Sequence, residues 1–198
     1  MEQKKEEKFT VKIDELIIYF MNNRNRMPSP RGLLVLVGGL VGISSQAAVK
    51  AKGLPFFLVT ANSKKYLFGD SLNYYLIESK NSFINLLKAK CKELLPNLEF
   101  PDIEKIVKNV SANVGNDDYK LENKYNPELF FPKYMMEWSN MFDIVNKSCS
   151  SPEGWPVLLT YVLNFFIEVY IKNDSENTFS SLLPIIIENA FYISKILQ

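Results

Sequence analysis

The stretch from Arg31 to Ala61 contains the longest apolar tract of the chain and most of its glycines. It fits two local folds that exclude each other. In one, Leu33–Val37 is a strand, the glycine-rich segment Gly38–Gly42 is a phosphate-binding turn, and Ile43–Lys52 is the helix that follows. In the other, Gly32–Lys52 is a single buried helix whose small residues let a second helix pack closely. The first interpretation predicts a nucleotide ligand, and the second predicts no ligand.

The glycine spacing resembles the first βαβ unit of flavin- and NAD-binding proteins. Gly39 and Gly42 stand where the second and third glycines of a G-x-G-x-x-G fingerprint would stand, but Val37 occupies the place of the first. The resemblance implies a nucleotide or flavin held at Gly38, Gly39 and Gly42. The next strand, Phe56–Thr60, ends without the acidic residue that binds a ribose hydroxyl. Because the remaining chain is helical where a doubly wound sheet needs more strands, we favour the single buried helix and expect no cofactor.

Apolar residues recur with a helical period along most of the remaining chain. This spacing predicts helices at about residues 10–24, 70–77, 82–95, 102–114, 133–147, 156–172 and 180–197. Aromatic and β-branched residues at Phe56–Thr60 and Lys65–Phe68 flank a short polar turn, which is typical of a β-hairpin. We therefore expect a mainly α protein, with a single helical domain and one small β-hairpin at about residues 55–68.

The charge pattern predicts the organisation of the chain around this domain. Residues 1–9 are charged and mixed in sign, which indicates a disordered tail, and residues 10–198 form the single helical domain. The polar segment 115–132 is expected to be a long loop within it. The start lacks the apolar run of a signal peptide, and the two most apolar segments span 17 residues each, fewer than the about 20 that cross a bilayer. We therefore expect a cytoplasmic protein without membrane contact.

The composition excludes several classes of function. The chain has no histidine and two cysteines, Cys91 and Cys149, which lie far apart. Catalysis by a Ser-His or Cys-His pair and zinc held by histidine or cysteine are therefore excluded. Cys91 lies on a helical apolar stripe and is expected to be an inert core thiol, whereas Cys149 is expected to be exposed. A net charge of +1 and the absence of a basic face argue against nucleic acid as a partner.

Carboxylates remain as candidate reactive groups. Asp117, Asp118 and Glu122 cluster in the 115–132 segment and would offer oxygens to a hard cation, but the pattern of a calcium loop is missing, and we expect no metal. Glu168 ends a polar series at every fourth position of an otherwise apolar helix. If it is buried, its pKa is raised and it can act as an acid or base. We favour a solvent-facing polar edge, and we expect no catalytic residue.

Two further groups of residues have both a structural and a functional interpretation. Gln46, Asn164 and Glu168 are candidate buried polar residues, and for Gln46 we favour a structural hydrogen bond within the fold. Four aromatic residues, Phe130, Phe131, Trp138 and Trp155, are candidates for a groove that binds a peptide or small ligand. Aromatic side chains are also ordinary core residues, and we favour that interpretation.

The last predicted helix is apolar on nearly every side, so it must be buried on more than one side. Self-association is one way for a chain of this size to cover such a helix. We therefore expect a non-enzymatic interaction or structural protein that forms a homodimer through its C-terminal helices, or that binds a protein partner. The alternative functions are nucleotide or flavin binding at Gly38–Gly42 and a carboxylate enzyme built on Glu168 or on Asp117 and Asp118.

Three short motifs resemble those of an uncharacterised family of small bacterial proteins. The motifs are Gly38-Gly39 with Gln46-Ala47, Phe68-Gly69-Asp70, and Glu188-Asn189-Ala190 with Ser194-Lys195. The resemblance implies a bacterial protein in which the glycine-rich segment is helical. It implies no activity, because none is attached to that family.

Overall fold

The apolar tract forms one helix, α2, from Pro30 to Ala51, and nearly all of its residues are buried. Ser29 caps the helix by accepting a hydrogen bond from the backbone nitrogen of Gly32 at 3.3 Å. Pro30 fits the first turn, where its missing N–H has no partner to lose. Because Leu33–Val37 is helical, the strand that a phosphate-binding turn requires does not form, and the nucleotide interpretation is wrong about this local fold.

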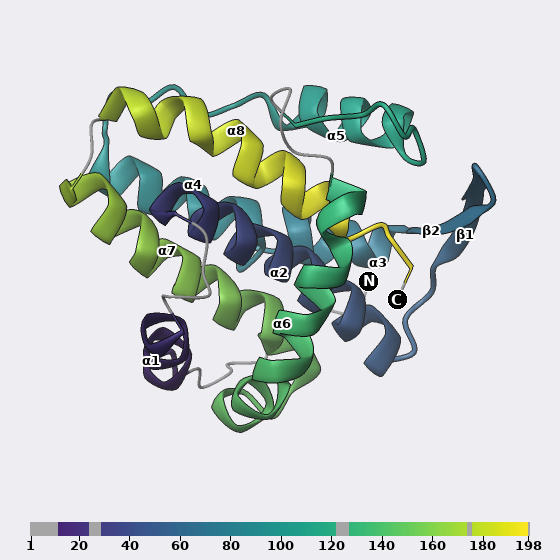
Figure 1. Cartoon of the computed structure of the whole chain (residues 1–198), viewed down its shortest axis with the longest axis horizontal. Coiled ribbons are helices and arrows are strands. Elements are labelled where there is room, and N and C mark those ends of the chain that lie inside the picture. The colour runs from purple at the N-terminus through teal and green to yellow at the C-terminus, as the bar shows by residue number, and fades with distance from the viewer. Residues whose placement is uncertain (1–11, 24–28, 122–126, 174–175, 198) are drawn as a thin grey trace, which may run out of the picture.

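A computed structural model describes residues 12–23, 29–121, 127–173 and 176–197, and it is mainly helical with one antiparallel hairpin (Figure 1). The predicted fold class is therefore confirmed, while the predicted tail at 1–9 lies outside the described residues. The elements after α2 in Figure 1 and the helix before it have the following bounds: α1 (Asp14–Asn22), β1 (Phe57–Ala61), β2 (Lys64–Phe68), α3 (Asp70–Asn73) with the π-helical turn Tyr74–Glu78, α4 (Phe83–Leu94), α5 (Ile103–Asn113), α6 (Pro127–Ser148), a 3-10 turn (Pro152–Gly154), α7 (Trp155–Asn173) and α8 (Glu176–Ile193).

The helix α2 crosses the middle of the helical body, with α7 and α8 packed along its two sides (Figure 1). Its glycines lie where other elements approach most closely. A Cβ atom at Gly38 would lie 2.8 Å from the Cγ2 atom of Ile186, and one at Gly42 would lie 2.9 Å from the backbone nitrogen of Ser194 and closer still to the carbonyl oxygen of Ala190. The glycines therefore serve helix packing, as the second interpretation of the tract predicts.

The helix α8 is buried on several sides within a single chain, while Ser180 and Ser181 face solvent. Leu182, Ile185, Ile186, Phe191 and Ile193 face different directions around its axis, yet each is at most 7% exposed. The covering elements include α2, α5 and α6. The prediction that this helix is buried on more than one side is therefore confirmed, and much of the cover comes from helices of the same chain.

The predicted hairpin is confirmed, and its turn is tight. β1 pairs with β2 in an antiparallel register from Phe57 opposite Phe68 to Ala61 opposite Lys64. Asn62 and Ser63 connect the strands with φ of 47° and 63°. Positive φ at both central residues defines a two-residue type I′ turn, whose twist matches that of the strands.

The polar segment predicted at 115–132 is shorter than expected, because α6 begins at Pro127 rather than near residue 133. Proline fits the first helical position. Pro132 lies inside the helix and leaves one backbone carbonyl without its intrahelical N–H. In the sequence, a proline at position 132 predicts the end of a loop. In the structure, α6 stays helical on both sides of Pro132, because it packs against α1, α2, α7 and α8.

We predict that Gly42→Ala destabilises the protein. Helix propensity alone would favour alanine by about 1 kcal/mol, but the added methyl group would meet backbone atoms of α8, and overpacking of this kind costs about 1–3 kcal/mol. Urea unfolding measures the change. Gly38→Ala is the matched comparison and should cost less, because its nearest backbone atom, the carbonyl oxygen of Ile186, would lie 3.1 Å away, farther than the backbone atoms that face Gly42. A Gly42→Ala variant more stable than the wild type would contradict this account of the α2–α8 contact.

Candidate functional site

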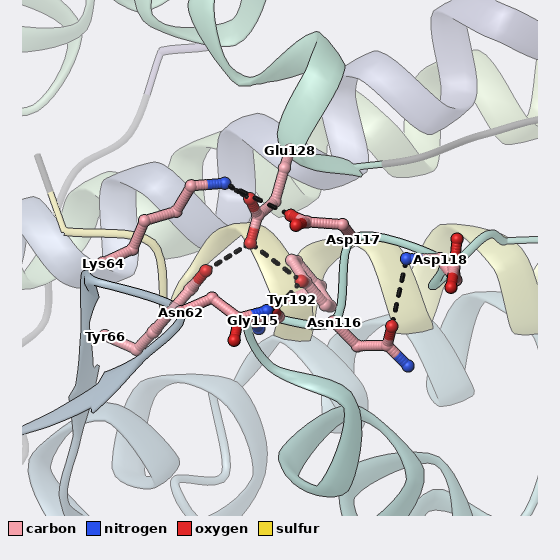
Figure 2. Close-up of polar contacts among 9 residues, drawn as sticks. All are labelled: Asn62, Lys64, Tyr66, Gly115, Asn116, Asp117, Asp118, Glu128 and Tyr192. Atoms are coloured by element: carbon pink, nitrogen blue, oxygen red, sulfur yellow. Dashed lines mark hydrogen bonds and ion pairs between the residues drawn. The ribbon is translucent and has the colours of Figure 1, made fainter.

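The carboxylate of Glu128 joins the hairpin to the helical body. It accepts hydrogen bonds from Lys64 and Tyr66 of β2, and from the hydroxyl of Tyr192 in α8 at 3.1 Å (Figure 2). The carboxylate of Asp117 lies 3.7 Å from the Lys64 ammonium group. We call Lys64, Tyr66, Asp117, Glu128 and Tyr192 the Glu128 cluster.

Local structure explains how these side chains meet. Lys64 and Tyr66 are two residues apart on β2, so both project from the same face of the hairpin. Glu128 lies in the first turn of α6, where a negative charge is favoured by the helix dipole. The side chain of Glu128 is 11% exposed, so its charge requires the hydrogen bonds that these neighbours donate.

The pKa values of Glu128, Tyr66 and Tyr192 are shifted away from neutrality. Burial alone would raise the pKa of Glu128, but the hydrogen bonds from Lys64 and Tyr66 outweigh it and leave this pKa below its usual 4.5. Burial, together with the neighbouring carboxylate, raises the pKa of Tyr66 and of Tyr192. A general acid or base works best with a pKa near the operating pH. The cluster therefore has the properties of a structural ion pair rather than of an acid–base pair.

The turn after α5 holds the tip of the hairpin. Asn62 donates a hydrogen bond to the carbonyl oxygen of Gly115, and the backbone nitrogen of Gly115 donates to the hydroxyl of Tyr192 at 3.4 Å. The φ of Gly115 is +78°, a conformation that favours glycine. The two acidic residues of this turn do not act together, since Asp118 points away from the Glu128 cluster in Figure 2.

The acidic segment considered as a cation site is therefore only partly present in the structure. Asp117 pairs with Lys64, Asp118 forms part of the turn, and Glu122 lies outside the described residues. Across the described ranges, no group of three or more His, Cys, Asp or Glu side chains is arranged to hold a metal ion.

A second polar group extends the cluster along α8. Tyr119 donates a hydrogen bond to Glu188, and Asn109 donates to the same carboxylate oxygen at 2.6 Å. The ring of Tyr119 stacks on that of Tyr192 with centroids 5.0 Å apart. These contacts join α5, the following turn and α8, and they continue the connection between the hairpin tip and the helices.

Lys195 is a buried lysine just beyond α8. It is 5% exposed, and its ammonium group lies 3.9 Å from the centre of the Phe68 ring. Burial lowers the pKa of Lys195 to about 8. A lysine with a lowered pKa can act as a nucleophile, but this amine is covered by the hairpin. No sequence pattern predicts a role for it, because its position just past an apolar helix does not reveal that the hairpin covers it.

Gln46 makes structural hydrogen bonds of the kind that its position in a buried helix predicts. Its side-chain nitrogen donates to the carbonyl oxygens of Ser194 at 3.0 Å and of Ile196 at 2.8 Å. These bonds hold the segment after α8 against α2. That segment in turn covers the outer edge of β2, through a bridge between Tyr66 and Ile196 and a 2.7 Å hydrogen bond from Leu67 to the carbonyl oxygen of Lys195.

The polar series on α7 is not a solvent-facing edge, so that prediction is wrong for two of its three residues. Thr160 and Asn164 are buried, and the side-chain nitrogen of Asn164 donates to the carbonyl oxygen of Leu86 in α4 at 3.4 Å. Glu168 is partly exposed and pairs with Lys172 and Lys90, which lower its pKa to about 2. The possibility of a buried acid with a raised pKa is therefore excluded for Glu168.

The four aromatic residues considered for a groove do not form one cluster. Trp138 and Trp155 are both 6% exposed, with ring centroids 6.1 Å apart, and Phe142 completes a three-ring core cluster with them. Phe130 and Phe131 are partly buried about two turns earlier on α6 and pack against the core.

The two cysteines have similar environments. Burial raises the pKa of Cys91 to about 12, in agreement with the expected inert core thiol. Cys149 was expected to be exposed, but it is 3% exposed, and burial raises its pKa as well. The polar neighbours of Cys149 in the sequence suggest exposure, but the buried indole of Trp155 donates a 2.9 Å hydrogen bond to the Cys149 carbonyl oxygen and holds this segment against the core.

The most exposed apolar surface of the hairpin is β1, and its exposure was not predicted. Phe56, Phe57, Leu58 and Val59 are between 39% and 60% exposed, although all four are large apolar residues. Within the described residues the sheet has two strands, so the outer edge of β1 is unpaired. We call residues 56–60 with these free backbone groups the β1 edge. Its apolar run is typical of a buried strand, which is why exposure was not expected.

No protein family, curated protein or solved structure that we compared matches the chain. By length and composition, α2 and the stretch 152–173 are each sufficient to cross a membrane. Their most apolar windows are 89% and 72% buried within the fold, as in the core helices of many soluble proteins.

We predict that Glu128→Gln destabilises the protein at pH 7 by roughly 1–3 kcal/mol, the cost of leaving buried hydrogen-bond partners of a charge unsatisfied. The pKa of Glu128 is lower in the folded than in the unfolded state, so its contribution is present above pH 4.5 and is lost as the pH falls through the folded value. Urea unfolding at several pH values should show that the difference in free energy of unfolding between wild type and variant becomes smaller in acid. A difference that stays constant down to pH 3 would contradict the stabilising role of the Glu128 carboxylate.

The matched control for this experiment is Glu104→Gln. Glu104 pairs with Lys108 on the exposed face of α5, and its side chain is 77% exposed. We expect this substitution to change the free energy of unfolding by less than about 0.5 kcal/mol.

We predict that Lys195→Met stabilises the protein at pH 7 by on the order of 1–3 kcal/mol, because the folded state must otherwise bury a charged amine. The folded pKa of about 8 lies below the unfolded value of 10.5, so the penalty is fully present below pH 8 and disappears above pH 10.5. Unfolding measured at pH 7 and pH 9.5 should therefore show the stabilisation falling by about half or more. A destabilised variant at both pH values would mean that the contact with Phe68 outweighs burial.

Proposed function

We propose that the protein is a non-enzymatic interaction protein that self-associates, and that the β1 edge is its contact surface. One observation carries the proposal: the residues that the structure describes cover one edge of the hairpin and leave the other bare. The segment after α8 occupies the edge of β2, fixed by Gln46, while β1 has exposed apolar side chains and free backbone groups. Proteins usually protect such edges with charges, prolines or bulges.

The chemistry of the polar residues supports a non-enzymatic role. The pKa of Glu128 is lowered and the pKa values of its tyrosine neighbours are raised, so neither is suited to proton transfer near neutrality. Glu168 is held as an ion pair with two lysines. The Glu128 cluster has a clear structural use, since it fixes the hairpin to α6 and α8.

The contact surface that we propose differs from the one expected from the sequence. Self-association was expected through the C-terminal helices. In the described part of these helices, the large exposed apolar residues are spread over two elements: Leu129 and Met136 on α6, and Tyr161 and Val169 on α7. The β1 edge offers four consecutive apolar residues together with backbone hydrogen-bonding groups. A cytoplasmic location, a bacterial source and the absence of nucleic acid or membrane partners remain part of the proposal, supported by the composition and the motif resemblance.

We predict that the wild-type chain shifts from monomer to dimer as its concentration rises, and that Leu58→Lys stays monomeric. A lysine on the β1 edge places charges opposite each other and should block strand pairing. Sedimentation equilibrium measures the mass, and circular dichroism checks that the variant remains folded. Met136→Lys is the matched control, because Met136 is 54% exposed on α6, and Leu58 is 43% exposed. A wild type that stays monomeric at all concentrations would overturn the proposal. Loss of the dimer only in Met136→Lys would mean that the contact surface lies on the C-terminal helices instead of the β1 edge.

A further inference from the structure

The exposed strand β1 also defines a geometry for the self-association proposed above, on which this step rests. We propose that two copies of the chain pair through β1 in antiparallel orientation, with the two-fold axis at Leu58. The two hairpins then form one four-stranded sheet, bordered on each side by the C-terminal segment that covers β2. The occupant of the β1 edge is therefore a second copy of this chain.

The hairpin register decides which backbone groups are free. The residues that flank a two-residue turn, Ala61 and Lys64, form a hydrogen-bonded pair, and such pairs alternate with non-hydrogen-bonded pairs along the strands. Phe57 and Val59 therefore direct their backbone groups toward β2. Leu58 and Thr60 direct theirs outward, to the bare edge. A second strand can hydrogen-bond to β1 only at these outward positions.

A two-fold axis at Leu58 satisfies this requirement. It makes Leu58 and Leu58 of the partner subunit a hydrogen-bonded pair, and it places Thr60 opposite Phe56 of the partner subunit. Phe57 then lies opposite Val59 of the partner subunit in a non-hydrogen-bonded pair, where side chains are closest. Aromatic and β-branched residues are favourable cross-strand neighbours. The symmetry creates this pair twice, so the strand is complementary to itself.

Charge and shape favour a second copy over an unrelated partner. No charged residue occurs from Leu54 to Ser63, so two β1 strands meet without like-charge repulsion. The strand therefore has no charged group with which to select a different partner. The hairpin projects beyond the helices in Figure 1, and the apolar side chains of residues 56–59 are exposed. The Glu128 cluster and the turn at Gly115 fix its orientation, so the edge is presented ready for pairing.

The size of the contact sets its strength. A stable interface typically buries about 800 Å² on each partner, and a single short strand provides less. We therefore expect a reversible dimer that forms with rising concentration. An engineered covalent bond between the strands tests the proposed register, because it traps a contact that forms only transiently.

The test uses Leu58→Cys, which places two thiols about 5.5 Å apart between Cα atoms, within the range that a disulfide spans. Oxidised glutathione is the oxidant, and a non-reducing gel reports the dimer. Thr60→Cys is the matched control on the same strand. In the proposed dimer, the two copies of residue 60 are displaced along the strands by about four residues, or about 13 Å, which is too far for a disulfide. The native thiols Cys91 and Cys149 are buried and do not compete. We expect Leu58→Cys to form covalent dimer at least about tenfold faster than Thr60→Cys.

A mixture of Phe57→Cys and Val59→Cys chains provides an independent test of the same register and covers the case in which Leu58→Cys does not fold. This pair should form the mixed disulfide, whereas Phe57→Cys alone should form little. If the wild type is dimeric by sedimentation but Leu58→Cys and Thr60→Cys react equally slowly, the proposed geometry is wrong and the self-association stands. If the wild type is monomeric at every concentration, both are wrong.

Discussion

The close contact between α2 and α8 is the constraint on which the rest of the structure depends. At Gly42 the two backbones approach so closely that even a methyl group would collide with α8. This contact brings Gln46, one turn later on α2, within hydrogen-bonding distance of the segment that follows α8. Because Gln46 is buried and must satisfy its amide, it fixes that segment beside the edge of β2. The position of the hairpin therefore follows from the packing of the two core helices.

The polar residues act as a connection between elements rather than as a reactive site. Glu128 and Tyr192 come from two helices, and Lys64 and Tyr66 come from one strand, so the cluster holds the hairpin at a fixed angle to the body. A hairpin alone is marginally stable in water. These bonds, together with the C-terminal segment on β2, explain how β1 can remain ordered while its apolar side chains face solvent.

The fold was largely predictable from the sequence, and the surface was not. Helical periodicity and the tight turn reveal the helices and the hairpin, because both depend on neighbouring residues. The Glu128 cluster joins residues far apart in the chain, so no local pattern reveals it. Burial also depends on the complete fold: Cys149 has polar neighbours in the sequence and is buried, whereas Phe57 has apolar neighbours and is exposed. The glycines of α2 were ambiguous for the same reason, since only their contact with α8 separates a packing surface from a phosphate-binding turn.

The measurement that tests the central claim most directly is amide hydrogen exchange along β1 as a function of protein concentration. The amides of Phe57 and Val59 should be protected at every concentration, because they bond to β2. The amides of Leu58 and Thr60 should exchange rapidly in dilute solution and become protected as the concentration rises, because they then bond to a second β1. If Leu58 and Thr60 exchange rapidly at all concentrations, the β1 edge has no strand partner and the central claim is contradicted.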